Sequence, residues 1–188
     1  MKVGVLALQG AFALHVAALE RLGVAAVEVR TPVELAEVDA LVVPGGESTT
    51  MSMLLERSGL FAAVAERLVG GMPALGTCAG AILLASEVLD GRPDQRCFGA
   101  LGMRIRRNGY GRQVQSFETD LDLGDGGPPL RAAFIRAPRI EGVDPSVEVL
   151  VSVGEDPVLC RRDAVVACTF HPELGSDDRI HEMFLARI

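Results

Sequence analysis

Short apolar runs alternate with segments of helical periodicity along the first half of the chain. The apolar runs have the length of strands, and the segments between them place apolar residues three or four positions apart. Strand-like runs cover 2–8, 25–30, 39–46 and 73–78, and helix-like segments cover 11–23, 49–59, 60–71 and 79–89. This alternation predicts βαβ units around a parallel sheet, and strands that are apolar throughout indicate helices on both faces.

The pattern changes beyond Gly91. Short strand-like segments separated by Gly- and Pro-rich turns cover 98–105, 114–121, 132–137, 147–153 and 165–170. A last helix is predicted over about 177–186, with Ser176 or Asp177 as its N-cap. We therefore expect an α/β fold of three layers, with a mostly parallel central sheet between helices, in one domain that spans residues 1–188.

Composition narrows the function classes. Hydrophobic residues make up 49% and charged residues 23%, which is typical of a folded globular protein, and no apolar run is long enough to span a bilayer. A net charge of -7 argues against nucleic acid as the main partner. A local arginine cluster could bind a small anion, or it could be a solvated strand edge. The cluster consists of Arg104, Arg106, Arg107 and Arg112.

The four cysteines lack CxxC spacing, and the first residues do not have the form of an export signal. We therefore expect free thiols and a cytoplasmic protein. Cys97, Cys160 and Cys168 also lack zinc-like spacing and are expected in the core, although a site formed by Cys160, Cys168 and His171 is a weak alternative. Glycine motifs for nucleotide binding are absent too, so we expect no metal and no cofactor.

The carboxyl ends of parallel strands usually carry the functional loops, and one such end places Cys78 between glycines. The stretch GTCAG at 76–80 has the form of a sharp strand-to-helix turn that presents a nucleophile. A Cβ at either glycine would clash with neighbouring strands or with the helix. The helix N-terminus would also favour a thiolate. A buried structural cysteine between packing glycines is the alternative, and this stretch alone does not decide between them.

A cysteine nucleophile needs a base, and the chain has three histidines. His15 and His181 lie inside predicted helices, where we expect them to pack or to face solvent. His171 follows a predicted strand, and the proline after it favours an extended backbone, so Glu173 should face the same way and orient the imidazole. Although HPE alone is also typical of a turn before a helix, the combination predicts a triad of Cys78, His171 and Glu173.

The stretch PGGEST at 44–49 ends another buried strand. Gly45 and Gly46 can expose backbone N–H groups opposite the N–H of Ala79, which predicts an oxyanion hole formed by Gly46 and Ala79. Ser48 or Thr49 is also expected to cap the helix that follows.

Together these motifs resemble the class I, or triad, glutamine amidotransferases. More narrowly, they are similar to the glutaminase subunits of the pyridoxal 5'-phosphate synthases that start from ribose 5-phosphate. The resemblance covers essentially the whole chain; GTCAG with HPE specifies only the superfamily, whereas LALQGAF, RNGYGRQ and FIRAP specify the subunit. It implies a flavodoxin-like fold, with Cys78 as nucleophile, His171 as general base and acid, and Glu173 as the partner of His171. It also implies glutamine contacts from Gly46, Glu47, Ser48, Arg107, Ile135 and Arg136.

The resemblance further implies a reaction and a partner. L-glutamine would be hydrolysed to glutamate and ammonia through a γ-glutamyl thioester, and the ammonia would pass to a barrel-shaped synthase subunit in a hetero-oligomeric ring complex. Pyridoxal phosphate would form on that subunit and not on this chain. Leu14 and Gly175 depart from the family pattern outside the triad. The alternatives are a glutaminase subunit for histidine or purine biosynthesis, and a non-catalytic module whose Cys78 senses oxidants.

Overall fold

The computed structural model describes residues 1–110 and 116–188, which contain a seven-stranded sheet in the order β10-β11-β12-β4-β3-β1-β2. The parallel strands are β2 (Ala25–Val29), β1 (Lys2–Leu6), β3 (Ala40–Val43), β4 (Ala74–Thr77) and β12 (Val165–Cys168). Their spatial order is the 2-1-3-4-5 order of flavodoxin-like folds. Two antiparallel strands, β11 (Asp156–Arg162) and β10 (Glu148–Val153), extend one edge. The predicted α/β fold is confirmed.

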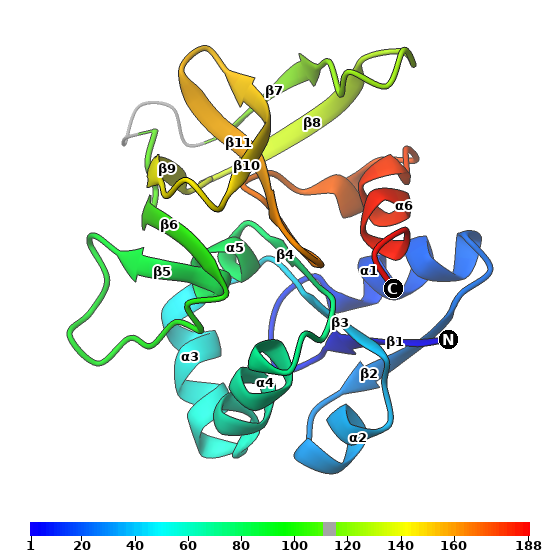
Figure 1. Cartoon of the computed structure of the whole chain (residues 1–188), viewed down its shortest axis with the longest axis vertical. Coiled ribbons are helices and arrows are strands. Elements are labelled where there is room, and N and C mark those ends of the chain that lie inside the picture. Colours follow the sequence, from blue (N-terminus) through cyan, green and yellow to red (C-terminus); the bar gives the residue numbers. More distant parts are fainter. Residues whose placement is uncertain (111–115) are drawn as a thin grey trace.

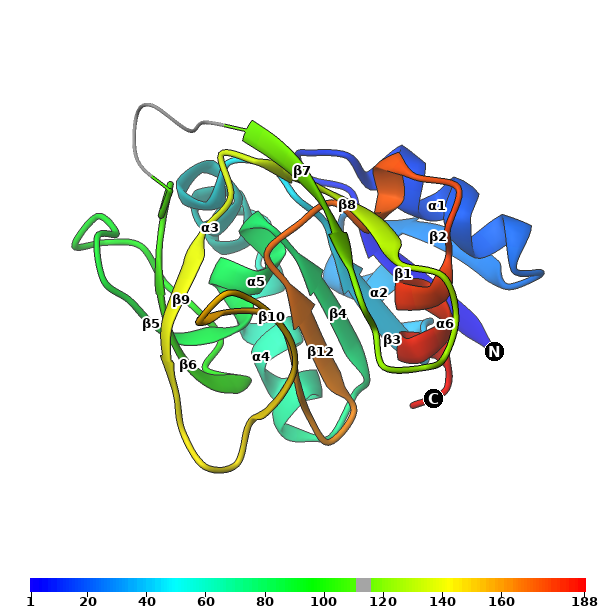
Figure 2. The same cartoon turned by 90° about the horizontal axis from the view of Figure 1, so that it is seen from above.

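Helices cover both faces of the sheet, as Figures 1 and 2 show. One face carries α1 (Phe12–Arg21) and α6 (Arg179–Leu185), and the other carries α2 (Pro32–Ala36), α3 (Ser48–Arg57), α4 (Leu60–Val69) and α5 (Ala79–Leu84). Side chains of β1 alternate between the two cores: Val3 and Val5 join the cluster under α1 and α6, whereas Leu6 joins the cluster under α3 and α4. Burial on both faces explains why the parallel strands are apolar throughout.

The second half of the chain adds two small sheets within the described residues. β5 (Ala85–Val88), β6 (Leu101–Arg106) and β9 (Arg139–Val143) form one of them. β7 (Ser116–Leu121) and β8 (Leu130–Ile135) form an antiparallel hairpin. Residues 114–115 of the predicted strand lie outside the described part of the chain. The hairpin crosses the sheet on the side of α6 in Figure 2, and the Ala133 carbonyl oxygen of β8 accepts from the His171 N–H at 2.9 Å, so the hairpin can contribute to a site.

Two predicted helices have different bounds in the structure. The helix predicted over 79–89 ends at Leu84, because residues 85–88 pair with β6 and this pairing outweighs the helical pattern. The last helix begins at Arg179 and is preceded by the 3-10 turn η1 (Pro172–Leu174). Its N-cap is Asp178 and not Ser176 or Asp177; the Asp177 carboxylate instead accepts from the Arg179 backbone N–H and guanidinium.

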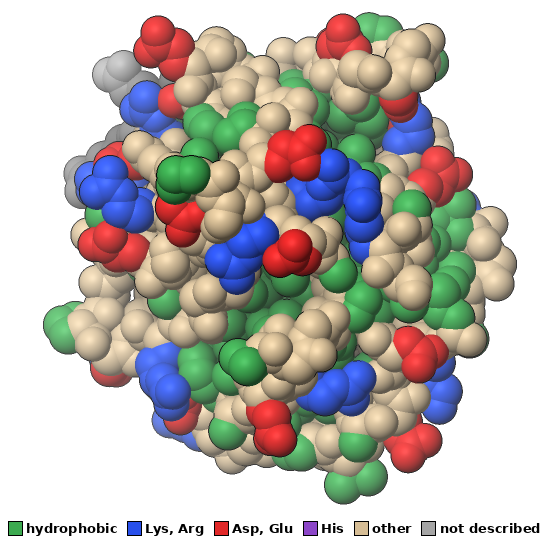
Figure 3. All heavy atoms as spheres, in the orientation of Figure 1, with side chains coloured by type: hydrophobic (Ala, Val, Ile, Leu, Met, Phe, Trp, Pro, Cys, Tyr) green, Lys and Arg blue, Asp and Glu red, His purple; other side chains and the backbone are tan. Residues whose placement is uncertain are grey.

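Acidic and basic side chains are interleaved over the face seen in Figure 3. Two members of the predicted arginine cluster are paired: Arg106 contacts Glu141 at 2.5 Å and Arg107 contacts Glu47 at 2.9 Å. Arg112 lies outside the described residues. Among the helices that the structure describes, none has the length and apolarity needed to cross a membrane.

Candidate active site

Cys78 lies in a strained turn between β4 and α5. Its backbone has φ 50° and ψ -104°, a region that residues other than glycine rarely adopt. A Cβ on Gly76 would come within 2.6 Å of the Leu84 side chain, and one on Gly80 would overlap the carbonyl oxygen of Val43. Both glycines are therefore required for the close packing of α5 against β3 and β4. The turn leaves Cys78 6% exposed, with its Sγ 3.9 Å from the Ile135 carbonyl oxygen.

His171 and Glu173 are in direct contact. His171 Nδ1 lies 2.7 Å from Glu173 Oε1, with 12% of the imidazole and 0% of the Glu173 side chain exposed. His171 itself lies outside the helical region, with φ -109° and ψ 86°, as the proline after it predicts, but Glu173 lies in η1 and the predicted extended segment is wrong. The reason is that proline also favours the first position of a helical turn. The turn still carries the carboxylate back to the imidazole.

The electrostatics of this pair favour an imidazolium beside a carboxylate. Burial alone lowers the pKa of His171, but its interactions with Cys78 and Glu173 raise that pKa to about 10. Burial raises the pKa of Glu173, whereas the hydrogen bond with His171 and the charges of His15 and His171 bring the pKa below its usual value. At neutral pH His171 therefore carries a proton that it can donate.

The loop after β3 lies against this pair. The carbonyl oxygen of Gly45 accepts from the Ala11 N–H at 3.3 Å, and because the peptide is trans, the Gly46 N–H points away from Ala11. Gln9 Oε1 accepts from the Glu47 N–H at 2.8 Å and holds the loop from the same side. Ala79 is the first residue of α5, where N–H groups have no acceptor within the helix. The two predicted oxyanion donors thus flank one space.

That space is a cavity of about 330 Å³, a size typical of sites for small molecules. Its lining includes every residue predicted to contact glutamine, both predicted oxyanion donors, Cys78 and His171: Gly46, Glu47, Ser48, Cys78, Ala79, Arg107, Ile135, Arg136 and His171. Glu173 lies behind His171. Sequence reasoning did not assign Gln9, Ala11, Ile82, Asn108 and Leu174, which also line the cavity. The stretch LQG at 8–10 was a signal for Gln9, since it follows a buried strand.

One wall of the cavity carries both a cation and an anion. Arg107 Nη2 lies 2.9 Å from Glu47 Oε1, and Arg107 Nη1 donates to Thr49 Oγ1 at 2.9 Å. The Glu47 carboxylate also accepts from the N–H groups of Thr49 and Thr50, so Glu47 caps α3. The cap expected from Ser48 or Thr49 is therefore wrong, because the longer carboxylate reaches both free amides. Paired opposite charges of this kind suit a zwitterionic amino acid.

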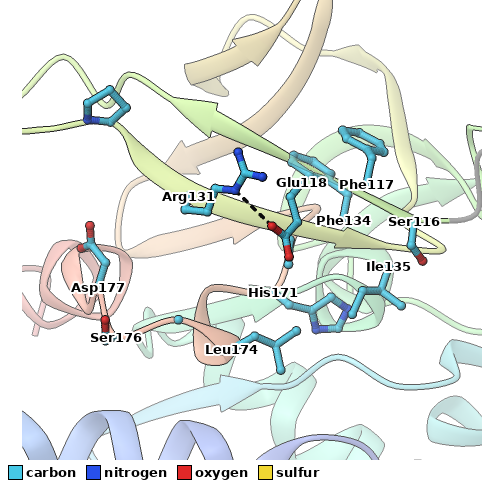
Figure 4. Close-up of a pocket in the computed structure, with 13 residues that line it drawn as sticks. Ser116, Phe117, Glu118, Arg131, Phe134, Ile135, His171, Leu174, Ser176 and Asp177 are labelled. Atoms are coloured by element: carbon cyan, nitrogen blue, oxygen red, sulfur yellow. Dashed lines mark hydrogen bonds and ion pairs between the residues drawn. The ribbon is translucent and has the colours of Figure 1, made fainter.

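A second cavity, of about 730 Å³, lies on another side of His171 beneath the β7–β8 hairpin (Figure 4). Ile135, His171 and Leu174 line both cavities. Arg131 and Glu118, 3.1 Å apart, lie on the strands above the imidazole in Figure 4. His171 therefore lies between the two cavities, an arrangement that the sequence did not predict.

The remaining cysteines do not line the cavity, although the Cys168 carbonyl oxygen accepts from the Cys78 N–H at 2.9 Å. Cys160 and Cys168 are buried, as predicted for core thiols, and burial raises the pKa of Cys160 to about 12. Cys97 is only half-buried, because it lies in the loop between β5 and β6 and not in a strand of the core. Among the residues that the structure describes, no three His, Cys, Asp or Glu side chains gather as a metal site.

The strand order and the turn that presents Cys78 after β4 define a flavodoxin-like α/β protein with a nucleophile turn, and comparisons with known proteins assign it to the glutamine amidotransferases. The model of the SNO glutamine amidotransferase family matches residues 5–188, and the chain belongs to this family. It is 51% identical over 185 residues to pyridoxal 5'-phosphate synthase subunit PdxT of Frankia alni, and this alignment covers 98% of this chain and 93% of that protein. The subunit PdxT of Rhodococcus jostii is 53% identical over 191 residues, and the alignment covers 97% of this chain and 95% of that protein.

Solved structures agree with this membership. A crystal structure described as a glutamine amidotransferase is 48% identical and matches with a TM-score of 0.92 over 98% of this chain and 97% of that one. A chain in the structure of PurLQS from Thermotoga maritima, 16% identical, matches with a TM-score of 0.72 over 98% of this chain and 97% of that chain, and shares the fold alone.

Proposed function

We propose that this chain is the glutaminase subunit of a pyridoxal 5'-phosphate synthase. It hydrolyses L-glutamine to L-glutamate and ammonia and passes the ammonia to the synthase subunit. The observation that carries this proposal is the cavity of about 330 Å³ in which Cys78, His171 and the Arg107–Glu47 pair meet. The name of the relatives from Frankia alni and Rhodococcus jostii supports the choice of acceptor.

The charged wall of the cavity binds the amino-acid end of glutamine. The Arg107 guanidinium grips the α-carboxylate, and the Glu47 carboxylate accepts from the α-ammonium group. Ser48, Ile135 and Arg136 complete the pocket along the side chain. Because Arg107 and Glu47 neutralise each other at 2.9 Å before binding, the zwitterion exchanges one ion pair for two. The side-chain amide of glutamine is then directed toward Cys78.

The chemistry follows from the groups around the thiol. The Cys78 thiolate attacks the amide carbon of glutamine, and the N–H groups of Gly46 and Ala79 stabilise the oxyanion. His171 donates its proton to the nitrogen as the C–N bond breaks, which releases ammonia and leaves the γ-glutamyl thioester. His171 then takes a proton from water, whose oxygen attacks the thioester carbon. The C–S bond breaks, which restores the Cys78 thiolate and the protonated His171, and the new γ-carboxylic acid loses its proton to solvent as glutamate leaves. Glu173 keeps the imidazole oriented throughout.

Ammonia released into water near neutral pH would largely become ammonium, which is a poor nucleophile. Transfer to an adjacent acceptor site avoids this loss, so the proposed unit is a hetero-oligomeric ring of barrel-shaped synthase subunits with this chain docked on the outside. In this assembly residues 1–188 act as one glutaminase domain in the cytoplasm, without a metal or pyridoxal phosphate of their own.

Glutamate release from L-glutamine tests the proposal, measured with and without the synthase subunit. We expect release that depends on both Cys78 and the synthase subunit. The control pair is Cys78→Ala, which removes the nucleophile, and Cys160→Ala, which removes a buried thiol of the core. Release that the synthase subunit leaves unchanged would reject the partner. Release that persists in Cys78→Ala would reject the mechanism.

A further inference from the structure

Two buried histidines meet behind the Glu173 carboxylate, on the side away from His171. His15 comes from α1 and His181 from α6, and both side chains are 0% exposed. His15 Nδ1 lies 2.9 Å from His181 Nε2. His15 Nε2 lies 3.4 Å from Glu173 Oε2 and 3.2 Å from Thr77 Oγ1. Four elements, α1, α6, β4 and η1, therefore converge on one carboxylate.

Glu173 needs a donor at this position. Its Oε1 pairs with His171, whereas among the described residues Oε2 has no hydrogen-bond partner, although His15 Nε2 lies 3.4 Å away. A buried carboxylate oxygen without a donor is costly, and His15 Nε2 is placed to supply one. Glu173 thus has a histidine on each oxygen.

The protonation of the two histidines sets the direction of the contacts. Burial lowers the pKa of His15 to about 4, an effect that Glu173 opposes and His181 and His171 reinforce. Burial also lowers the pKa of His181; the charges of Asp178 and Glu173 oppose this effect, and the charge of Arg21 adds to it. Each ring is therefore neutral near pH 7 and carries one N–H.

Only one arrangement gives Glu173 a donor. In that arrangement His181 Nε2–H donates to His15 Nδ1, and the single proton of His15 is on Nε2, which lies 3.2 Å from Thr77 Oγ1 and 3.4 Å from Glu173 Oε2. The opposite tautomer would point a lone pair at the carboxylate. The chain of contacts then runs from His181 through His15 and Glu173 to His171 and Cys78.

We propose that His15 and His181 are positioning residues of the active site: they hold Glu173, and through it His171, in the orientation that serves Cys78. This inference rests on the proposed glutaminase function. Packing alone does not account for the pair, because apolar side chains would fill these helix positions without burying polar nitrogens. His181 Nδ1 has no hydrogen-bond partner among the described residues, a cost that packing alone would not require.

Three substitutions of His15 test the proposal. His15→Gln places an amide N–H near the position of Nε2, His15→Asn is too short to reach Glu173, and His15→Leu has no donor. Each variant is assayed for glutamate release with the synthase subunit. We expect His15→Asn and His15→Leu to lower kcat about 10-fold or more, the effect of a hydrogen bond to a charged group, while His15→Gln stays within about threefold. The KM for glutamine should not change, because His15 does not line the cavity.

Leu35→Ala is the control for lost stability. Leu35 is buried in α2, at the far edge of the sheet, so this variant should unfold more easily while keeping its kcat. A kcat that falls equally in all three His15 variants in step with their stability would overturn the inference, as would a rise in KM. An unchanged kcat in all three variants would also overturn the inference about His15. The proposed glutaminase function would still stand if the wild-type protein released glutamate in a Cys78-dependent way.

A spectroscopic measurement does not depend on glutaminase activity. The His171 Nδ1–H that faces Glu173 at 2.7 Å should give a downfield proton resonance in the free chain. We expect this resonance in the wild-type protein and in His15→Gln, and an upfield shift or loss by exchange with water in His15→Asn. An identical resonance in all of them would overturn the inference, even if the wild-type protein released no glutamate.

Discussion

The two halves of the proposed triad are built in different ways. The conformation of Cys78 is set within a few residues, because Gly76 and Gly80 permit a turn that a Cβ at either position would block. The position of Glu173 depends on side chains from opposite ends of the chain, since His15 and His181 meet behind it. The nucleophile is therefore placed by backbone geometry, whereas the base is placed by the packing of α1 and α6. A substitution that disturbs the turn around Cys78 should unfold the site, whereas one that disturbs the histidines behind Glu173 should lower the activity of a folded site.

Gly80→Ala tests the first half and has the largest expected effect. The new Cβ would overlap the Val43 carbonyl oxygen, which is backbone of the central strand β3 and has little freedom to move. We expect a loss of about 3 kcal/mol or more in the free energy of unfolding, together with loss of glutamate release. Urea unfolding followed by circular dichroism measures the loss.

Gly71→Ala is a suitable control for this change, since a Cβ there meets no atom within 4 Å although its φ of 87° adds local strain. A Gly80→Ala protein as stable as Gly71→Ala would contradict the view that backbone packing places the nucleophile.

The pH dependence of stability tests the second half. The pKa of His15 is about 4 in the folded protein against 6.5 as its ordinary value, because burial of the ring, reinforced by His181 and His171, outweighs the charge of Glu173. Between these values the unfolded chain binds a proton that the folded protein excludes, so stability is complete above pH 6.5 and falls as the pH drops toward 4. From pH 7 to pH 5 the wild-type protein should lose about 2 kcal/mol more than His15→Gln.

Urea unfolding of both proteins at the two pH values measures this difference, and the comparison cancels the carboxylates that they share. Parallel losses in the two proteins would mean that His15 is already protonated in the folded state, so its Nδ1–H would donate to His181 Nε2 and the inferred direction of that contact would be wrong.

The same contrast explains what could be predicted from the sequence. The parallel sheet follows from apolar runs, and the Cys78 turn follows from glycine spacing, because both are local patterns. The bounds of β5 could not be predicted, since Ala85–Val88 continue a helical pattern until β6 pairs with them. His15 and His181 gave only a weak signal: each occupies a buried helix position, and their meeting across the chain is a tertiary contact.

The double variant Gly45→Ala with His15→Asn tests whether the two halves of the site are independent. The expected effect, a non-additivity in the free energy of unfolding, is the smallest of the three. A Cβ on Gly45 would overlap His171 Cε1 and approach His171 Nδ1 to 3.0 Å, so it would push against an imidazole that Glu173 contacts on its other side, with His15 behind Glu173. In the wild-type background the ring cannot yield. With His15→Asn the contact behind Glu173 is weaker and the His171 ring can move. Gly45→Ala should therefore lower the free energy of unfolding less in the His15→Asn background than in the wild-type protein.

We expect the costs in unfolding free energy to be non-additive by about 1 kcal/mol in a double-mutant cycle measured by urea unfolding. The matched cycle replaces Gly45→Ala with Leu35→Ala, which lies at the far edge of the sheet and should be additive with His15→Asn. Additivity in both cycles would show that the support behind Glu173 does not reach His171, and the two halves of the site would then be independent.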